Sequence, residues 1–107
     1  LLLHADVDEY VSKNVATLIR EIAKHSAELS QLIVNTGGVA ALVDYVQEAS
    51  GTNKIPGIMA LGYISQASER LAKAVIVSHA VAPVAQALAR HVLLFFYFNL
   101  LLILNGF

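Results

Sequence analysis

The four histidines are the side chains of this sequence best suited to hold a metal ion or to move a proton. They are His4, His25, His79 and His91. No two of them are four residues apart, so they lack the spacing that places two zinc ligands on one face of a helix. The sequence contains no cysteine, which excludes disulfides and thiolate ligands. We therefore expect no metal site and no cofactor.

Two other pairs have residue types that enzymes use, but their surroundings favour structural roles. His25 precedes Ser26, yet neighbours in sequence need not face each other as a base and a nucleophile must. Gly57 and Gly62 are spaced as in a phosphate-binding loop, but Tyr63 follows where such a loop has lysine, and no strand precedes them. The sequence therefore predicts no catalytic site, and we expect a protein that is not an enzyme.

The elements that carry these residues repeat after 42 positions. Residues 22–29 read Ile-Ala-Lys-His-Ser-Ala-Glu-Leu, and residues 64–71 read Ile-Ser-Gln-Ala-Ser-Glu-Arg-Leu. The apolar positions recur, as do the serine at the junction and the leucine three residues after it. Helical repeats of about 40–47 residues are typical of HEAT and armadillo solenoids, which form elongated binding scaffolds.

We therefore predict an all-α fold, an armadillo-repeat right-handed solenoid fragment with two repeats of three helices and an apolar C-terminal helix. Helices are expected in pairs related by the same offset, at 12–24 and 54–66, at 27–36 and 69–78, and at 39–49 and 81–90. The predicted division is a remnant of a preceding repeat or helix at 1–10, repeats at 11–51 and 52–90, and a non-repeat tail at 91–107.

Local signals mark the ends of these helices. Ser26 and Ser68 stand where N-caps are expected, each with a glutamate close behind it that faces the positive helix end. Gly37 and Gly38 predict the end of a helix, because glycine adopts the left-handed conformation at little cost. Thr52 or Asn53 is expected to cap the fourth helix, and Pro56 and Pro83 to lie in first turns.

Apolar residues at helical spacing define the expected core. Gly57 and Gly62 each cost helix propensity, so we expect a neighbouring helix to come close at both. The stripes predicted to face inward are Val11, Val15, Leu18, Ile19, Ile22, Leu29, Leu32, Ile33, Val39, Leu42, Val43, Val46, Ile58, Leu61, Ile64, Leu71, Val75, Ile76, Val81, Val84 and Leu88.

Charge is unevenly distributed along the chain. The net charge is −1, which gives no general attraction to nucleic acid. Residues 1–50 carry seven carboxylates against three cations, and residues 51–107 carry four cations against one carboxylate. This asymmetry favours head-to-tail stacking with a similar unit or contact with an acidic partner, and the alternative is ordinary solvated helix faces.

The repeated third helices of a solenoid line up into a concave strip that binds partners. Alanines on such a strip leave space for a partner, although alanine is also simply a good helix former. The alternative is that the strip is solvated. The residues predicted to form it are Ala40, Ala41, Asp44, Glu48, Gln86 and Arg90.

Residues 92–104 form an apolar run without amphipathic period. As a helix this run would be about 20 Å long, whereas a bilayer core needs about 30 Å, and Arg90-His91 precedes it. We expect the run to be buried in a homo-oligomer, with a small membrane-tethered protein as the alternative. The acidic residues soon after Leu1 argue against a secretory signal, so we expect a cytoplasmic protein. The residues predicted to associate are Phe95, Phe96, Phe98, Leu101 and Leu102.

Two strings resemble repeats of the sperm-associated antigen 6 family. Residues 20–42 read Arg-Glu-Ile-Ala-Lys-His-Ser-Ala-Glu-Leu-Ser-Gln-Leu-Ile-Val-Asn-Thr-Gly-Gly-Val-Ala-Ala-Leu, and residues 56–64 read Pro-Gly-Ile-Met-Ala-Leu-Gly-Tyr-Ile. Residues 68–69 and 71–78 continue the second match. The resemblance runs from about Val11 to Arg90, and the Pro-Gly-Ile-Met-Ala-Leu-Gly-Tyr string is far more specific than a general armadillo pattern.

The resemblance implies a non-catalytic armadillo-repeat protein on a central-pair microtubule of the axoneme, needed for the motility of cilia and flagella. Its implied partners are tubulin or other central-pair proteins, and its implied location is the cytoskeleton. The alternative within the same fold is a general armadillo adaptor that binds peptides in transport or signalling.

Overall fold

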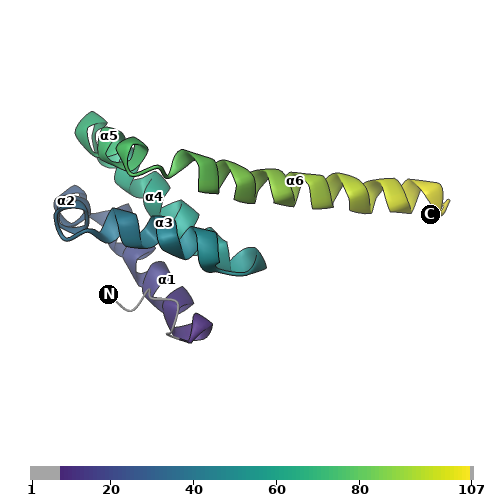
Figure 1. Ribbon diagram of the computed structural model, residues 1–107, viewed down its shortest axis with the longest axis horizontal. Coiled ribbons are helices and arrows are strands. Elements are labelled where there is room, and N and C mark those ends of the chain that lie inside the picture. Colours follow the sequence, from purple (N-terminus) through teal and green to yellow (C-terminus); the bar gives the residue numbers. More distant parts are fainter. Residues whose placement is uncertain (1–7, 107) are drawn as a thin grey trace.

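The computed structural model describes residues 8–106, without the side chain of His91, and this part of the chain is all-helical (Figure 1). The prediction of an all-α fold is confirmed, and no strand occurs in these residues. The helices are α1 (Glu9–His25), α2 (Ala27–Asn35), α3 (Gly38–Glu48), the short 3₁₀ helix η1 (Gly51–Lys54), α4 (Ile55–Ala67), α5 (Glu69–Val77) and α6 (Val81–Leu104).

The junctions between helices recur at the 42-residue offset. Ser26 Oγ accepts a hydrogen bond from the Leu29 amide, and Ser68 Oγ accepts one from the Leu71 amide, both at 3.1 Å. The chain turns through the left-handed region at Gly37 (φ 82°) and again at its counterpart His79 (φ 64°). Each predicted serine cap is therefore confirmed, and so is the helix end at Gly37.

The first helix begins inside the segment that we predicted to belong to a preceding element. The side chain of Asp8 accepts a hydrogen bond from the Tyr10 amide at 2.8 Å and caps α1, which starts at Glu9. Asp8 satisfies an amide that has no partner within the helix, so the helix extends two residues further than its apolar pattern. The remainder of the predicted remnant, including His4, lies outside the described residues.

The start of α4 also differs from its prediction. Neither Thr52 nor Asn53 caps it, because both belong to η1, and Lys54 precedes α4 without a capping side-chain bond. The Asn53 carbonyl instead accepts a hydrogen bond from the buried Tyr45 hydroxyl, which fixes the turn against α3. Pro56 lies in the first turn of α4, as predicted.

The core lies where α4 packs against the three preceding helices, most extensively against α1. The predicted stripe of α3 is confirmed, since Val39, Leu42, Val43 and Val46 are all buried. Small residues carry much of the α1 contact, because helices approach closely only where side chains are short. Those that are buried on α1 include Ser12, Ala16 and Ala23 as well as Ile19.

Several residues that we predicted to face the core are exposed instead. Leu18 is 60% exposed and Leu32 is 54% exposed, because no described helix covers their side of α1 and α2. The same holds at the other end of the chain, where Val81 is 61% exposed and Leu88 is 51% exposed. The predictions that are wrong in this respect concern Val11, Leu18, Leu29, Leu32, Ile76, Val81 and Leu88.

Only one of the two helical glycines has the close neighbour that we predicted. A Cβ on Gly57 would lie 2.8 Å from Tyr45 Cδ2 and 3.0 Å from Val46 Cγ2, so this glycine lets α4 approach α3. A Cβ on Gly62 would meet nothing within 4 Å in the described chain. The prediction for Gly62 is therefore wrong.

We predicted that the tail forms a helix of its own. In the structure it instead continues the sixth helix, α6. α6 runs without interruption from Val81 to Leu104, and its C-terminal half leaves the body of the protein (Figure 1). At the positions that correspond to Ser50-Gly51 it has Val92-Leu93, which give no reason to turn. Its 24 residues make it the one described helix long and apolar enough to cross a membrane.

Candidate protein-binding site

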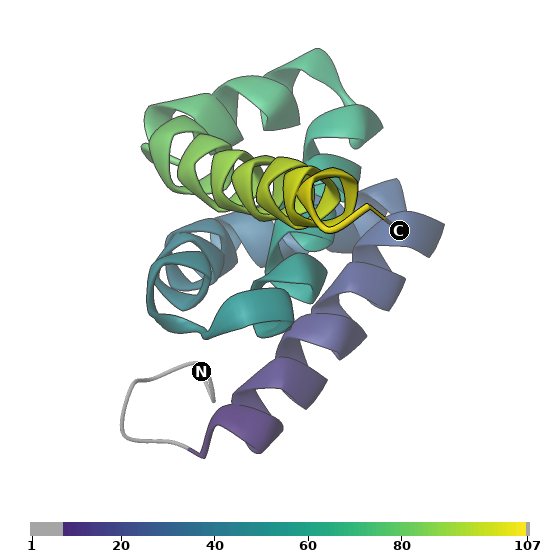
Figure 2. The same cartoon turned by 90° about the vertical axis from the view of Figure 1, so that its right-hand side faces the viewer.

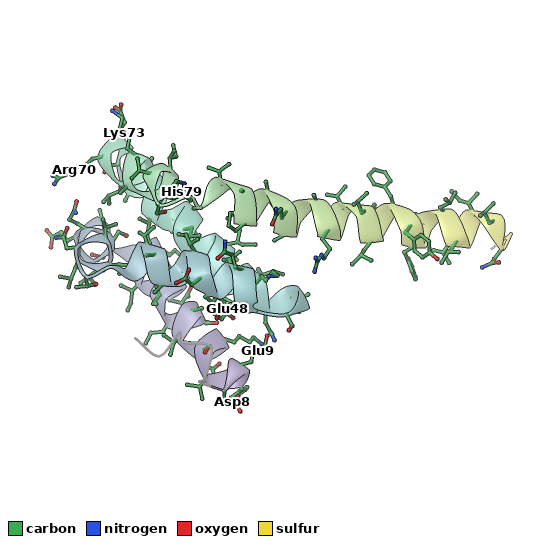
Figure 3. The ribbon with its side chains drawn as sticks, in the orientation of Figure 1. Asp8, Glu9, Glu48, Arg70, Lys73 and His79 are labelled. Atoms are coloured by element: carbon green, nitrogen blue, oxygen red, sulfur yellow. The ribbon has the colours of Figure 1, made fainter. Side chains whose placement is uncertain are left out.

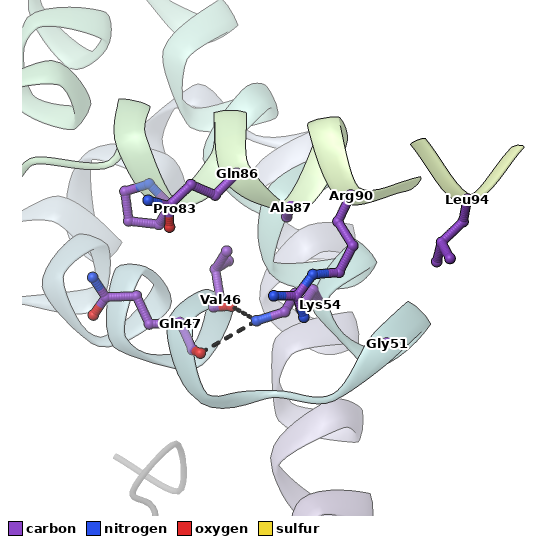
Figure 4. A pocket seen from close by; sticks show the side chains of 9 residues that line it. All are labelled: Val46, Gln47, Gly51, Lys54, Pro83, Gln86, Ala87, Arg90 and Leu94. Carbon is purple, nitrogen blue, oxygen red and sulfur yellow. Dashed lines mark hydrogen bonds between the residues drawn. The ribbon is translucent and has the colours of Figure 1, made fainter. Parts of the chain in front are cut away.

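A pocket of about 360 Å³ lies between the end of α3, η1 and α6. Lys54 forms its floor, and the Lys54 Nζ donates hydrogen bonds to the Val46 carbonyl and, at 3.3 Å, to the Gln47 carbonyl (Figure 4). These are carbonyls of the last turn of α3, where the helix dipole favours a cation. Lys54 thus holds the turn that follows α3 against the end of that helix.

A second cation reaches into the same pocket from α6. Arg90 points toward Lys54 in Figure 4, and Gln47 and Gln86 line the pocket beside them. Within the described residues Arg90 makes no ion pair with a carboxylate. A guanidinium of this kind can donate paired hydrogen bonds to a carboxylate, and the two amides can bind backbone groups.

The acidic start of α1 ties it to the same inter-repeat turn. Glu9 Oε1 accepts a hydrogen bond from the Ser50 amide at 2.6 Å and one from Asn53 Nδ2 at 3.3 Å. The hydrogen bond from the Ser50 amide, followed by that from Asn53, lowers the pKa of Glu9. The pKa of the Tyr45 phenol is raised, mainly because the side chain is buried and secondly because the Glu9 carboxylate is near.

The predicted concave strip is only partly gathered at this pocket. Gln86 and Arg90 line it, whereas Asp44 and Glu48 are exposed on α3 and do not. The strip residues Ala40 and Ala41 are exposed and half-buried respectively, also away from the pocket. The structure thus brings together the two α6 residues with Gln47 and Lys54, which the sequence analysis did not select.

Lys54 had a detectable signal in the sequence. It follows the end of a predicted helix by a few residues, where a lysine commonly binds the last carbonyls.

The predicted self-association residues are all exposed on α6. Phe95, Phe96 and Phe98 are largely exposed, while Leu101 and Leu102 are less so. The Phe95 and Phe96 rings lie edge to face with centroids 6.1 Å apart. In the described chain this half of α6 packs against no other helix, so its apolar surface is available to a partner.

The described residues contain no group of three or more histidine, aspartate or glutamate side chains that could hold a metal ion. His25 ends α1 and His79 lies between α5 and α6, as predicted. Ser26 Oγ is engaged as a cap.

No protein-family model matches this chain, and no curated protein matches it. The resemblance to the sperm-associated antigen 6 family therefore rests on the residues quoted for it.

Proposed function

We propose that this chain is a non-catalytic armadillo-repeat scaffold of the axonemal central apparatus that supports ciliary and flagellar motility. Its partners in this proposal are tubulin or other central-pair proteins. The observation that carries the scaffold role is the return of the same caps and the same left-handed turn after 42 residues. A chain built in this way repeats a binding surface rather than enclosing a catalytic pocket.

The pocket at Lys54 and Arg90 supports a protein partner with acidic side chains. Two cations and two amides converge there from α3, η1 and α6. Hydrogen bonds to a charged group contribute about 1.5–3 kcal/mol each, so loss of the Arg90 guanidinium should weaken binding about tenfold or more.

Co-sedimentation of the purified chain with microtubules tests this proposal. We expect the chain to pellet with microtubules, and Arg90→Glu to raise the dissociation constant about tenfold. Arg70→Glu is the matched control, because Arg70 is exposed on α5 away from the pocket (Figure 3). An unchanged affinity for Arg90→Glu, or an equal loss for Arg70→Glu, contradicts a role for the pocket.

A general armadillo adaptor for peptides in transport or signalling is the alternative use of the same pocket. It predicts binding to short acidic peptides in the absence of microtubules, with the same sensitivity to Arg90→Glu. Fluorescence anisotropy with a labelled acidic peptide distinguishes the two, since an axonemal scaffold requires the assembled microtubule or a central-pair protein.

The exposed half of α6 supports homo-oligomer formation through Phe95, Phe96, Phe98, Leu101 and Leu102. Each large apolar side chain that is buried contributes about 1.5–3 kcal/mol. We expect sedimentation of the full chain at micromolar concentration to give a mass above 11.5 kDa. We expect the double variant Phe95→Glu/Phe98→Glu to lower that mass, and an unchanged mass contradicts this contact.

A membrane tether is a second candidate, which the length and exposure of α6 favour. Arg90 divides the helix, however, and the 14 residues after it span only about 21 Å, against about 30 Å for a bilayer core. Flotation with phosphatidylcholine vesicles tests it: recovery of the chain with the vesicles supports a tether, and recovery in the dense fraction contradicts it.

A further inference from the structure

An apolar groove of about 410 Å³ opens on the outer side of the second repeat. It lies between α4, α5 and α6. Gly62 lines it, and a Cβ on Gly62 would meet nothing within 4 Å in the described chain. The large side chains that line it include Leu61, Val75, Ile76, Val81, Val84 and Leu88.

The first repeat has the same surface, and there it is filled. Counting back 42 residues from Leu61, Val81, Val84 and Leu88 gives Ile19, Val39, Leu42 and Val46. All four are buried, and α4 packs against the helices that carry them. The groove therefore corresponds to the surface of α1 and α3 that α4 covers, 42 residues further along the chain. A helix equivalent to α4 would fit it.

The counterpart of α4 within this chain is α1. Its residue Leu18 corresponds to Ala60 of α4, and Leu18 is 60% exposed whereas Ala60 is fully buried. Val11 is likewise exposed. The face of α1 that would occupy such a groove is thus apolar and uncovered.

We propose that the groove binds α1 of a second copy of this chain, so that copies stack head to tail. The two surfaces lie on opposite sides of the molecule, since α1 and α6 flank α3 and α4 in both views (Figures 1 and 2). A contact between different surfaces of identical chains closes into a ring or extends as a filament. It requires neither a microtubule nor any other partner.

Charge favours this orientation. Figure 3 shows Asp8 and Glu9 on the side of the molecule opposite to Arg70 and Lys73, so a head-to-tail stack brings acidic side chains of one copy toward basic side chains of the next.

The straight course of α6 keeps the groove open. In the first repeat the chain turns after Glu48 through η1, and α4 then covers α3. After Arg90 the chain continues outward instead, and the space beside α6 that corresponds to α4 is left free.

Disulfide trapping tests the stack, because the natural sequence contains no cysteine. The contact of Gly57 with Val46 corresponds to Val15 with Leu88. A Cβ on Gly57 would lie 3.0 Å from Val46 Cγ2, which is one bond from the Val46 Cβ, so a disulfide can span the corresponding positions. We expect a mixture of Val15→Cys and Leu88→Cys chains to give a cross-linked heterodimer under mild oxidation. The matched control mixture, Val15→Cys with Lys73→Cys, is expected to give at least tenfold less.

A second variant separates the contact from any loss of folding. Leu18→Glu in the Val15→Cys chain should lower the yield at least tenfold, whereas Lys24→Glu on the same helix should leave it unchanged. Helix content by circular dichroism confirms that each variant is folded. Equal yields in the two mixtures, or homodimers of Val15→Cys in place of heterodimers, would overturn the proposal, whereas a failure of microtubule binding would not.

Discussion

The helices α3 and α6 begin in the same way and end differently. α3 follows the left-handed turn at Gly37 and has 11 residues, while α6 follows the left-handed turn at His79 and has 24. After α3 the chain leaves the helix at Ala49, and Gly51 has φ 52°. Between Arg90 and Gly106 the sequence has no glycine or proline, so nothing breaks the helix and it continues.

The comparison separates two properties that a repeat pattern combines. The residues just beyond a helix decide its length, whereas the helix that follows in space decides whether its apolar stripe is buried. α3 has both a turn and a cover, and its stripe is buried. α6 has neither, and the corresponding residues are exposed or half-buried.

The largest expected difference lies between the two stripes. Leu42 is 0% exposed and Leu88 is 51% exposed, so Leu42→Ala leaves a cavity where Leu88→Ala does not. We expect Leu42→Ala to lower the free energy of unfolding by about 2–5 kcal/mol, and Leu88→Ala by less than about 1 kcal/mol. Urea unfolding measures both at a concentration where the chain is monomeric, and equal losses would contradict the difference in burial.

The two glycines of α4 sharpen the comparison, because Gly57 packs against α3 whereas Gly62 lines the open groove. Gly57→Ala is expected to destabilise the protein by about 1–3 kcal/mol, since its Cβ would overlap the Tyr45 ring. Gly62→Ala should stabilise it by about 1 kcal/mol, because alanine is the better helix former and nothing lies within 4 Å. Thermal unfolding of both variants checks the opposite signs; a shift of the same sign in both would contradict them.

The two serine caps are expected to contribute equally to stability, unlike the two apolar stripes. Ser26→Ala and Ser68→Ala each remove one 3.1 Å hydrogen bond to a helix amide, and each should cost about 1 kcal/mol. Because the caps are local, we expect the two losses to agree despite the difference in burial around them. Chemical denaturation of both variants provides the measurement, and a loss confined to one repeat would show that the caps depend on their surroundings.

The smallest expected effect concerns the tie between α1 and the turn after α3, which α6 lacks. The pKa of Glu9 is lowered, so its stabilising effect is present above its ordinary value of 4.5 and is lost as the pH falls through the lowered value. We expect Glu9→Gln to be less stable than the natural chain at neutral pH and equally stable at strongly acidic pH. Unfolding curves across this range test the prediction, with Glu48→Gln as the control; a difference that persists in acid would contradict it.

The local features of this fold were predictable from its sequence. Ser26, Ser68, Gly37 and Pro56 act within a few residues of their own positions, so their roles follow from local chemistry. The exposed stripes were not predictable in the same way. Leu18 and Leu88 have the spacing of core residues, but burial depends on whether another helix is seated on them, and a pattern within one helix carries no information about that.

The candidate site shows the same limit. Arg90 and Gln86 were selected from their helix face, but their neighbours Lys54 and Gln47 come from elements on the other side of the pocket. Lys54 reaches back to carbonyls seven and eight residues earlier, a contact set by the path of η1. Such a pocket depends on how two repeats pack, which single-helix patterns do not specify.

The uninterrupted α6 also has a mechanical consequence. Beyond Arg90 it extends by 14 residues, about 21 Å, from a base where Pro83, Val84 and Ala87 pack against the body. A tilt of about 10° at that base would displace its far end by roughly 4 Å over this length. A ligand in the pocket beside Arg90 would therefore act on the short arm of a lever whose long arm carries the aromatic side chains.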